Sequence, residues 1–274
     1  MNDCTIVRNQ RGQPKRSGPD ALTQIVNYIR VRVVGNLRSS APLTLVTGAD
    51  ESHALPLRRF LRSVLEHEPG TETIVYDLGL KQKDRALISR HFNLRTFDFA
   101  AHPDHCDIKV NAGQYAWKPA ILHQVASERS GNLVCWMDAG NIITEPLKEL
   151  RWALALNGFY SPIGFWYFGD WVHPGMLRYF GLPTDWRHFK WTLAACVVAV
   201  DTRCPKAVEL ISQWALHAGV RDCIAPVGSD RSNHRQDQAL ISLLAYRNGF
   251  VPSFPPSQLG FVAHQDESTH WATI

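Results

Sequence analysis

The sequence predicts an α/β fold in which a mostly parallel central sheet is flanked by helices. Four short apolar runs are predicted to be strands: Leu43–Thr47, Thr73–Asp77, Leu94–Phe99 and Leu133–Met137. Three stretches with helical patterns lie between them: Leu55–Leu65, Lys81–His91 and Ala120–Glu128. Alternation of strands with helices is typical of a parallel, doubly wound sheet, because parallel strands need a long crossover connection.

Composition places the chain among globular proteins. Its 274 residues, 45% hydrophobic and 20% charged, suit one large α/β domain. No run approaches the roughly 18 apolar residues of a membrane span, and the N-terminus lacks the apolar core of a signal peptide. The six cysteines are scattered without a Cys-x-x-Cys pair. We therefore expect reduced thiols in the core of a cytoplasmic protein, with neither disulfides nor a zinc site.

The N-terminal region carries most of the positive excess in a chain whose net charge is +4. Residues 1–18 are predicted to be a flexible basic segment, and residues 19–274 a single domain. A helix is predicted to start at Pro19, with apolar residues at helical spacing: Leu22, Ile25, Val26, Ile29 and Val33. We expect this helix to pack on the domain, the alternative being contact with an anionic membrane surface. Few aromatic residues interleave the basic ones, which argues against nucleic acid as a partner.

The second half of the chain alternates less regularly. Phe159–Phe180 is rich in aromatic residues and interrupted by glycines, so we expect an irregular segment that forms one wall of a pocket. Aromatic faces suit sugar rings; the alternative is a loop with a local hydrophobic cluster. Thr192–Val200 is predicted to be a strand and Pro205–Ala218 a helix. A further helix is predicted to open within Asn233–Gln238 and to continue through Tyr246.

The most informative stretch is Leu133–Ile143, where an apolar strand breaks abruptly into Asp138, Gly140 and Asn141. Ligands of open α/β sheets bind beyond the carboxyl ends of the strands, and glycine permits a close approach to the backbone. An ordinary polar turn is the alternative. The turn Gly48–Asp50 after the first strand can likewise present backbone N–H groups to a phosphate. It is neither Gly-x-Gly-x-x-Gly nor a Walker A loop, which argues against a dehydrogenase.

Five motifs occur in a characteristic order. They are Val46-Thr-Gly-Ala-Asp50, Tyr76-Asp-Leu-Gly-Leu80, Tyr115-Ala-Trp-Lys-Pro119, Trp136-Met-Asp-Ala-Gly-Asn141 and His234-Arg-Gln-Asp-Gln238. The ordered set resembles nucleotide-sugar glycosyltransferases of the GT-A fold, over about Leu43 to His264. It looks especially like an uncharacterised group of bacterial and animal proteins that carry the motifs Tyr-Asp-Leu-Gly-Leu and Tyr-Ala-Trp-Lys-Pro. It is more distantly similar to the group of glycogenin and the lipopolysaccharide galactosyltransferases. The resemblance implies one GT-A type, Rossmann-like domain.

The resemblance implies a metal site with one substitution. Such enzymes place Asp-x-Asp at the end of the fourth strand, where it holds Mn²⁺ or Mg²⁺ on the donor diphosphate. Here the second position is Gly140, so Asp138, Asn141 and His264 are the candidate ligands. One carboxylate, one amide and one imidazole are few ligands for a hard cation, which prefers carboxylate oxygens. Without a metal, Lys118 or Arg235 would neutralise the diphosphate.

The resemblance also implies roles in donor binding and catalysis. The turn after the first strand would seat the nucleoside. In an inverting enzyme Asp237 would act as general base, the alternative being that it binds a donor-sugar hydroxyl. In a retaining enzyme no carboxylate is placed as nucleophile, and the leaving diphosphate would assist. Asp138 is the second candidate catalytic residue. The candidate donor-binding residues are Thr47, Gly48, Ala49, Asp50, Asp77, Lys118, Asp138, Gly140, Arg235 and Gln238.

The implied activity is transfer of a sugar from a UDP- or GDP-sugar to a glycan or glycolipid acceptor. The expected process is synthesis of cell-surface polysaccharide or lipopolysaccharide, in the cytoplasm or at the inner face of the membrane. Gly140 supports an alternative, a non-catalytic module that binds nucleotide-sugars or glycans. A nucleotidyltransferase would carry a long, basic, Gly-rich loop after the first strand, whereas Gly48–Glu51 is short and acidic.

Overall fold

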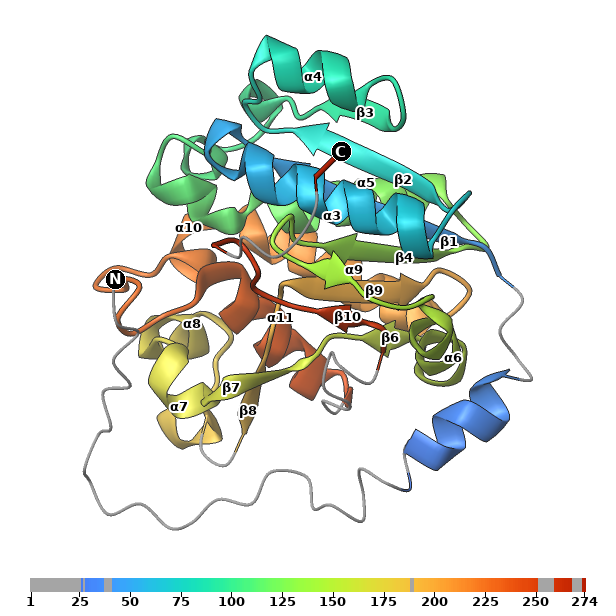
Figure 1. Ribbon diagram of the computed structural model, residues 1–274. Helices are drawn as coiled ribbons and strands as arrows, with labels where there is room; N and C mark the ends of the chain where they lie inside the picture. Colours follow the sequence, from blue (N-terminus) through green and yellow to red (C-terminus); the bar gives the residue numbers. More distant parts are fainter. Residues whose placement is uncertain (1–25, 27, 37–40, 188–189, 251–258, 268–272) are drawn as a thin grey trace.

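A six-stranded sheet forms the centre of the protein, in the order β3-β2-β1-β4-β9-β6 (Figure 1). The computed structural model describes residues 26, 28–36, 41–187, 190–250, 259–267 and 273–274. The strands of this sheet are β1 (Leu43–Ala49), β2 (Glu72–Asp77), β3 (Asn93–Thr96), β4 (Leu133–Met137), β6 (Phe159–Tyr160) and β9 (Val197–Asp201). The first four are parallel, and β9 runs antiparallel to both of its neighbours. The predicted fold class is confirmed.

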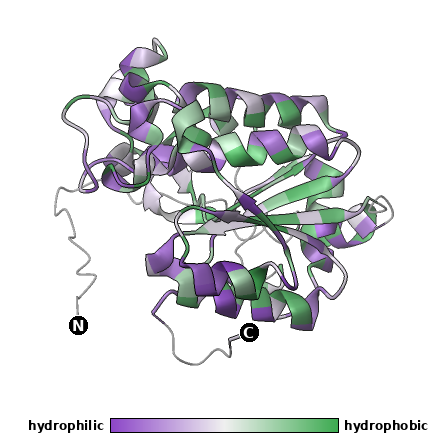
Figure 2. Ribbon diagram, turned by 90° about the horizontal axis from the view of Figure 1, so that it is seen from above, coloured by the Kyte–Doolittle hydropathy of each residue, from purple (hydrophilic) through white to green (hydrophobic). Residues whose placement is uncertain are grey.

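Helices cover both faces of this sheet, and Figure 2 shows them above and below the hydrophobic strands. The longer ones are α3 (Ala54–His67), α4 (Gln82–Ile88), α5 (Trp117–Glu128), α6 (Lys148–Asn157), α9 (Pro205–Ala218) and α11 (Gln236–Arg247). Successive side chains of a strand point to opposite faces. Leu45 and Cys135 therefore pack with α3 and α6, whereas Val46 and Trp136 pack with α5, α9 and α11. Because both faces are buried, the strands are continuously apolar.

Shorter elements surround the main sheet. Two small antiparallel sheets pair β5 (Ile142–Ile143) with β10 (Phe261–Val262), and β7 (Ile163–Tyr167) with β8 (Trp191–Leu193). The short helices are α7 (Phe168–Trp171), α8 (Pro174–Tyr179) and α10 (Arg221–Ile224). The 3-10 turns are η2 (Glu51–His53), η3 (Phe99–Ala101), η4 (Asp104–Cys106), η5 (Asn111–Tyr115) and η6 (Thr184–Arg187).

Three predictions about local structure need correction. Phe159–Phe180 is not irregular, since it forms β6, β7, α7 and α8. The strand predicted at Thr192–Val200 is two strands, β8 and β9, in different sheets. The third strand stops at Thr96, and Phe99 begins a 3-10 turn. In each case the conformation depends on pairing with a strand that is distant in sequence. Such pairing cannot be read from the local pattern of residues.

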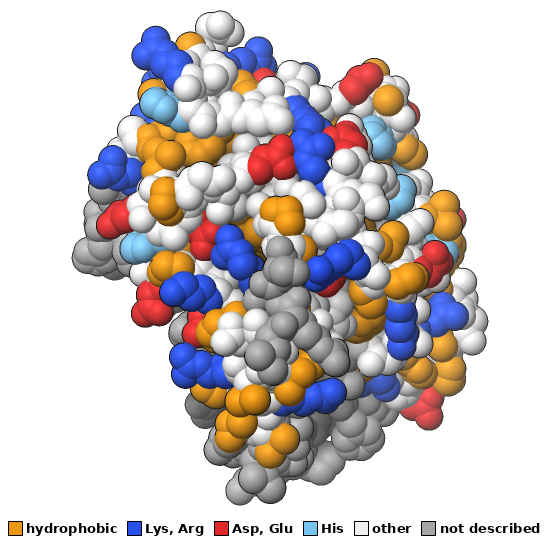
Figure 3. Space-filling view, turned by 90° about the vertical axis from the view of Figure 1, so that its right-hand side faces the viewer, with side chains coloured by type: hydrophobic (Ala, Val, Ile, Leu, Met, Phe, Trp, Pro, Cys, Tyr) orange, Lys and Arg blue, Asp and Glu red, His pale blue; other side chains and the backbone are white. Residues whose placement is uncertain are grey.

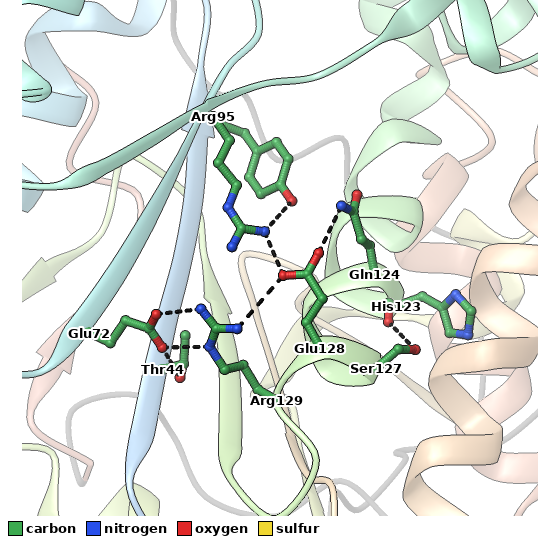
Figure 4. A network of polar contacts seen from close by, with 9 residues as sticks. Thr44, Glu72, Arg95, His123, Gln124, Ser127, Glu128 and Arg129 are labelled. Carbon is green, nitrogen blue, oxygen red and sulfur yellow. Dashed lines mark hydrogen bonds and ion pairs between the residues drawn. The ribbon is translucent and has the colours of Figure 1, made fainter.

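A polar network ties the end of α5 to the amino ends of β1 and β2, as Figure 4 shows. Arg129 Nε and Nη2 donate to Glu72 at 2.8 and 2.6 Å, and Thr44 Oγ1 donates to the same carboxylate at 2.9 Å. Arg95 on β3 donates to Glu128 at 2.7 Å. The network links side chains of β1, β2 and β3 to the C-terminal end of α5.

The N-terminal helix packs on the domain, but through a face other than the predicted one. It includes the π-helical turn η1 (Val31–Gly35), and it contacts α6 through buried Val31 and Gly35. A Cβ at Gly35 would lie 2.5 Å from the carbonyl oxygen of Trp152. The predicted packing residues Val26, Ile29 and Val33 are instead 54, 55 and 59% exposed.

The side of the molecule that carries η1 is seen in Figure 3, where hydrophobic and Lys or Arg side chains lie next to one another in the lower part. Pro19, Leu22, Ile25 and the basic segment 1–18 fall outside the described residues. Within the described part of the chain, no helix has both the length and the apolar character needed to cross a bilayer.

Candidate active site

A cavity of about 780 Å³ opens where the carboxyl ends of β1 and β4 meet the N-terminal ends of α5 and α11. Most of the residues predicted for the site line it: Gly48, Ala49, Asp50, Lys118, Asp138, Gly140, Asn141, Arg235, Asp237, Gln238 and His264. They come from five separate segments. A cavity at the strand ends of an α/β sheet is the usual position of a ligand site in this class of fold.

Two predicted donor-binding residues lie outside the lining of this cavity. Thr47 is buried within β1. Asp77 is buried at the end of β2, where it accepts hydrogen bonds from the backbone N–H groups of Gly79 and Leu80 at 2.9 and 2.7 Å. It also forms a 2.6 Å ion pair with Arg85. Asp77 thus closes the turn after β2, and the structure does not bring it to the cavity.

Lys118 lies between two carboxylates at the base of the cavity. Its buried Nζ is 3.0 Å from Asp138 Oδ1, 3.1 Å from Asp237 Oδ2 and 3.2 Å from the carbonyl oxygen of Ala195. An ammonium group has three donors, so protein oxygens surround all three. Lys118 therefore reaches the predicted place, but it holds two acidic side chains in position and has no donor left for a diphosphate.

The helix dipole favours one charge of this network and disfavours another. Lys118 occupies the first turn of α5, where the positive end of the helix dipole disfavours a cation. Burial alone would also lower its pKa, but Asp138 and Asp237 outweigh both effects and raise it. Asp237 occupies the first turn of α11, which suits an anion. Burial nevertheless raises the pKa of Asp237 to about 6, despite the neighbouring Lys118.

Asp138 follows directly after strand β4 and lines the cavity. Its Oδ1 accepts a 2.6 Å hydrogen bond from Trp136 Nε1 in addition to the contact with Lys118. Both contacts use Oδ1, and the side chain is 37% exposed. The second oxygen, Oδ2, is therefore the part of Asp138 left to contact a ligand.

Asn141 carries a buried oxygen to which none of the residues described by the structure donates a hydrogen bond. Its Nδ2 donates to the carbonyl oxygen of Cys196 at 2.8 Å. A carbonyl can only accept, so the amide nitrogen must face it, and Oδ1 is left buried and unbonded. An unsatisfied buried acceptor costs about 1–3 kcal/mol. Such a cost is expected where the group serves a ligand rather than the fold.

The turn after β1 is fixed by its own polar contacts. Asp50 caps the 3-10 turn η2, accepting from Ser52 Oγ at 2.7 Å and from the backbone N–H of His53 at 3.1 Å. Burial opposes ionisation of Asp50, but these hydrogen bonds outweigh it and lower its pKa. Asp50 is thus an anion held at the rim, next to Gly48 and Ala49.

Aromatic and basic residues form another part of the wall. Tyr115 lies between two cations, with Lys118 Nζ 5.7 Å and the guanidinium of Arg231 6.0 Å from its ring centroid. Arg231 also donates to Tyr115 Oη at 3.2 Å. On the other side, Trp166 contacts the cavity, and Arg235 stacks on the ring of Trp171 at 4.1 Å. Of the aromatic segment Phe159–Phe180, Trp166 alone lines the cavity among its described side chains.

The segment before α5 has an uncommon backbone. Asn111, Ala112, Gly113, Gln114 and Tyr115 all have positive φ, between 48° and 62°. Left-handed conformation costs roughly 1 kcal/mol or more for each residue with a Cβ. Because Ala112 and Tyr115 line the cavity, this strain lies where a ligand would bind, as is common at functional sites.

Tyr115, Arg231 and Asp266 line the cavity but were not among the predicted site residues, whereas Trp166 lies in the aromatic segment that was predicted to form a pocket wall. Tyr115 belongs to one of the recognised motifs, so its position could have been inferred. Arg231 and Asp266 lie in loops whose placement depends on tertiary contacts. For Asp266 one signal existed, since the lack of a carboxylate at Gly140 implies a replacement elsewhere in the chain.

The donor set suits a hard divalent cation only in part. Asp138 Oδ2 and the unbonded Asn141 Oδ1 are oxygen ligands of the kind that Mg²⁺ and Mn²⁺ prefer. Within the part of the chain that the structure describes, no three His, Cys, Asp or Glu side chains converge into a group able to hold a metal by themselves. A cation would therefore need further oxygens from its ligand.

Solved glycosyltransferase structures are similar to this chain at low identity. The galactosyltransferase LgtC, in complex with donor and acceptor sugar analogs, is 17% identical, with a TM-score of 0.47 over 81% of this chain and 86% of that protein. Mouse xyloside xylosyltransferase 1 is 12% identical, with a TM-score of 0.46 over 78% and 84%. The bifunctional glycosyltransferase WbbM is 13% identical, with a TM-score of 0.49. That match covers 79% of this chain and 39% of WbbM.

No protein-family model and no curated protein sequence matches the chain.

Proposed function

We propose that this protein is a glycosyltransferase that moves a sugar from a nucleoside diphosphate donor, a UDP- or GDP-sugar, to a glycan or lipid-linked acceptor. The network in which buried Lys118 joins Asp138 to buried Asp237 carries this proposal. It lies at the base of a cavity large enough for a nucleotide-sugar. Its three members belong to three of the motifs that resemble GT-A enzymes, and those motifs meet at one site.

Asp237 is the residue we assign to proton transfer or to binding of a donor hydroxyl. A carboxyl group with a pKa of about 6 is mostly ionised at pH 7, yet it accepts a proton more readily than an ordinary carboxylate does. If the reaction inverts the anomeric centre, Asp237 takes the proton of the acceptor hydroxyl. If it retains, Asp237 binds a hydroxyl of the donor sugar. In both cases Lys118 positions the carboxylate.

We assign donor binding to the rim of β1 and β4. Gly48 and Ala49 line the cavity at the end of β1, where the nucleoside would lie, and Asp50 can accept hydrogen bonds from a ribose. Asp138 Oδ2 and Asn141 Oδ1 would hold Mn²⁺ or Mg²⁺, which when bound neutralises charge on the leaving diphosphate. Arg231 and Arg235 are the cations placed to contact the diphosphate directly. The rings of Trp166 and Tyr115 suit the sugar units.

We further propose that the protein acts at the inner face of a membrane, in the synthesis of a cell-surface polysaccharide or lipopolysaccharide. The exposed stripe of Val26, Ile29 and Val33 on the N-terminal helix lies beside exposed Arg30 and Arg32. Apolar side chains that enter the lipid boundary, flanked by cations, are typical of interfacial helices. A lipid-linked acceptor would then be presented at the same surface.

The decisive experiment is a thermal-shift panel of nucleoside diphosphates with Mn²⁺ or Mg²⁺, followed by assay of nucleoside diphosphate release from the matching sugar donors. We expect UDP or GDP to raise the melting temperature of the wild type and to have little effect on Asp138→Asn. The exposed Asp222→Asn variant is the matched control. If no nucleoside diphosphate stabilises the wild type, the proposal is wrong.

The alternative is a module that binds nucleotide-sugars or glycans without catalysis. Gly140, in place of a second carboxylate, is the observation that favours it. Such a module would show the same thermal shift but would release no nucleoside diphosphate from any sugar donor. Release above the uncatalysed rate, lost in Asp237→Asn, would exclude it.

A further inference from the structure

We infer that Asp266, near the C-terminus, supplies to a bound cation the carboxylate that position 140 lacks. The inference rests on the proposed function, because it concerns the cation of a nucleoside diphosphate complex. Asp266 lines the same cavity as Asp138 and Asn141 although it lies more than 120 residues away in the chain. None of the sequence motifs includes it.

The side chain of Asp266 occupies the space in front of Gly140. A Cβ added to Gly140 would overlap both carboxylate oxygens and Cγ of Asp266. A carboxylate from position 266 thus stands where the side chain of residue 140 would begin. The glycine is explained by this contact, because any other residue at position 140 would displace the Asp266 carboxylate.

Backbone contacts hold the C-terminal segment in this place. Gln265 N donates to the carbonyl oxygen of Gly140 at 2.6 Å. Strand β10 pairs with β5, which begins directly after Asn141, with Phe261 opposite Ile143 and Val262 opposite Ile142. Because antiparallel pairing fixes the register, residues that follow β10 must run alongside those that precede β5. Asp266 therefore reaches Gly140 as a consequence of strand pairing.

A buried side chain, Arg59, contacts the C-terminal segment at Asp266. Arg59, from α3, is buried, and its Nη1 donates to the carbonyl oxygen of Asp266 at 3.5 Å. Among the described residues, no lysine or arginine forms an ion pair with the Asp266 carboxylate. The Asp266 backbone is thus held by Arg59, while its carboxylate is among the groups that line the cavity.

The unbonded Oδ1 of Asn141 points independently to a ligand at this place. This oxygen is fully buried next to Gly140, and no residue in the described part of the chain donates a hydrogen bond to it. Together with Asp138 and Asp266 it gives three oxygen-bearing side chains, which is the ligand chemistry of Mg²⁺ and Mn²⁺. The two carboxylates are fewer acidic groups than a self-sufficient site requires, so the diphosphate must complete the coordination.

The test measures Mn²⁺ binding by the electron paramagnetic resonance signal of free Mn²⁺, with and without UDP or GDP, on the full chain. For the wild type we expect weak binding of Mn²⁺ alone and at least about tenfold tighter binding with the preferred nucleoside diphosphate. Asp266→Asn should weaken binding of the complex by about ten- to a hundredfold. Glu267→Gln, an exposed acidic neighbour, is the control and should bind as the wild type does.

A pair of exchange variants makes the test specific to this geometry. Gly140→Asp alone should disturb binding, because its side chain overlaps Asp266. Gly140→Asp combined with Asp266→Gly moves the carboxylate back to the loop after β4 and should restore Mn²⁺ binding relative to Asp266→Gly. Restoration would not follow from a merely structural role of Asp266.

The outcomes separate the two proposals. If the wild type binds neither UDP nor GDP under any condition, the proposed function fails. If the wild type binds a nucleoside diphosphate with Mn²⁺ and Asp266→Asn binds it equally well, the function stands and the role of Asp266 is refuted. Binding of the nucleoside diphosphate that is unaffected by Mn²⁺ or by EDTA would also refute it.

Discussion

At the scale of single residues, Lys118 is the side chain on which the site depends most. It is a buried cation at a helix N-terminus, an unfavourable place that only its two carboxylate partners make tenable. Removing it leaves Asp138 and Asp237 facing each other without compensation. The consequence is electrostatic rather than a loss of packing.

We expect Lys118→Met to lower the free energy of unfolding by about 3–5 kcal/mol, because breaking a buried pair leaves uncompensated charge. Urea unfolding monitored by circular dichroism would measure it. Lys83→Met, at an exposed position of α4, is the control and should stay within about 0.5 kcal/mol of the wild type. Equal losses in the two variants would show that the network contributes nothing to stability.

Asp237 predicts a pH dependence with a definite sign. Its pKa in the folded protein is about 6, above its ordinary value of 3.8. The folded state therefore binds this proton more tightly than the unfolded chain does. The contribution of Asp237 to stability is fully present below about pH 4 and is lost as the pH rises through 6.

We expect the difference in free energy of unfolding between the wild type and Asp237→Asn to change across pH 4 to 6, by about 1–3 kcal/mol in total. The difference should level off above pH 7. If Asp237 acts as general base, the rate of sugar transfer should rise with pH and reach its plateau above an apparent pKa near 6. A pH-independent stability difference would contradict the assignment of the pKa.

At the scale of elements, the left-handed segment Asn111–Tyr115 connects the fold with the cavity. Gly113 lies at its centre with φ +62°, and a Cβ there would overlap the carbonyl oxygen of Cys106. Trp117 Nε1 donates to the carbonyl oxygen of Ala112 at 3.0 Å, which fixes the segment to the start of α5. The segment thus positions Tyr115 and Lys118 together.

Gly113→Ala should therefore destabilise the protein by more than the cost of placing an alanine at a positive φ. Gly181 has a similar φ, +64°, with no atom within 4 Å of an added Cβ, so Gly181→Ala isolates the cost of the angle. We expect roughly 1 kcal/mol for Gly181→Ala and at least twice that for Gly113→Ala, measured by thermal unfolding. Similar losses would show that the segment moves to accept the methyl group.

The N-terminal helix gives the second prediction at this scale. The 274-residue chain should co-sediment with vesicles that contain phosphatidylglycerol and should dissociate from them at high salt. Ile29→Asp should abolish this binding, because burial of an isoleucine in the lipid boundary contributes roughly 1.5–3 kcal/mol. Leu216→Asp, at another exposed apolar position, on α9, is the control. Binding that survives Ile29→Asp would exclude the helix as the membrane contact.

At the scale of the whole molecule, one sheet separates two hydrophobic layers. Because neighbouring residues of the same strand belong to different layers, neither layer can lose its packing while the strands keep theirs. The cavity lies across both layers, with Asp138 at the end of β4 and Lys118 and Asp237 on the helices of one side.

We expect the two layers to unfold in a single transition. Far-ultraviolet circular dichroism, which follows all elements, and fluorescence of the tryptophans, of which Trp136 and Trp214 lie in the α5–α9–α11 layer, should give the same midpoint. A nucleoside diphosphate at a hundred times its dissociation constant should raise the free energy of unfolding by about 2.7 kcal/mol in both measurements. Two separated transitions would show that the layers are independent.

The sequence by itself determined the fold class, four of the six central strands within a few residues, and eleven of the residues that line the cavity. Those features are local: an apolar run that ends at Asp138 needs no partner to be recognised, and Pro205–Ala218 carries its own helical signal. Only the tertiary structure decided that Lys118 is enclosed by Asp138 and Asp237, that Asp77 closes a turn, and that Asp266 lies at Gly140. The physical reason is that each of these depends on contacts between residues distant in sequence, whose electrostatic and packing energies leave no periodic trace in the chain.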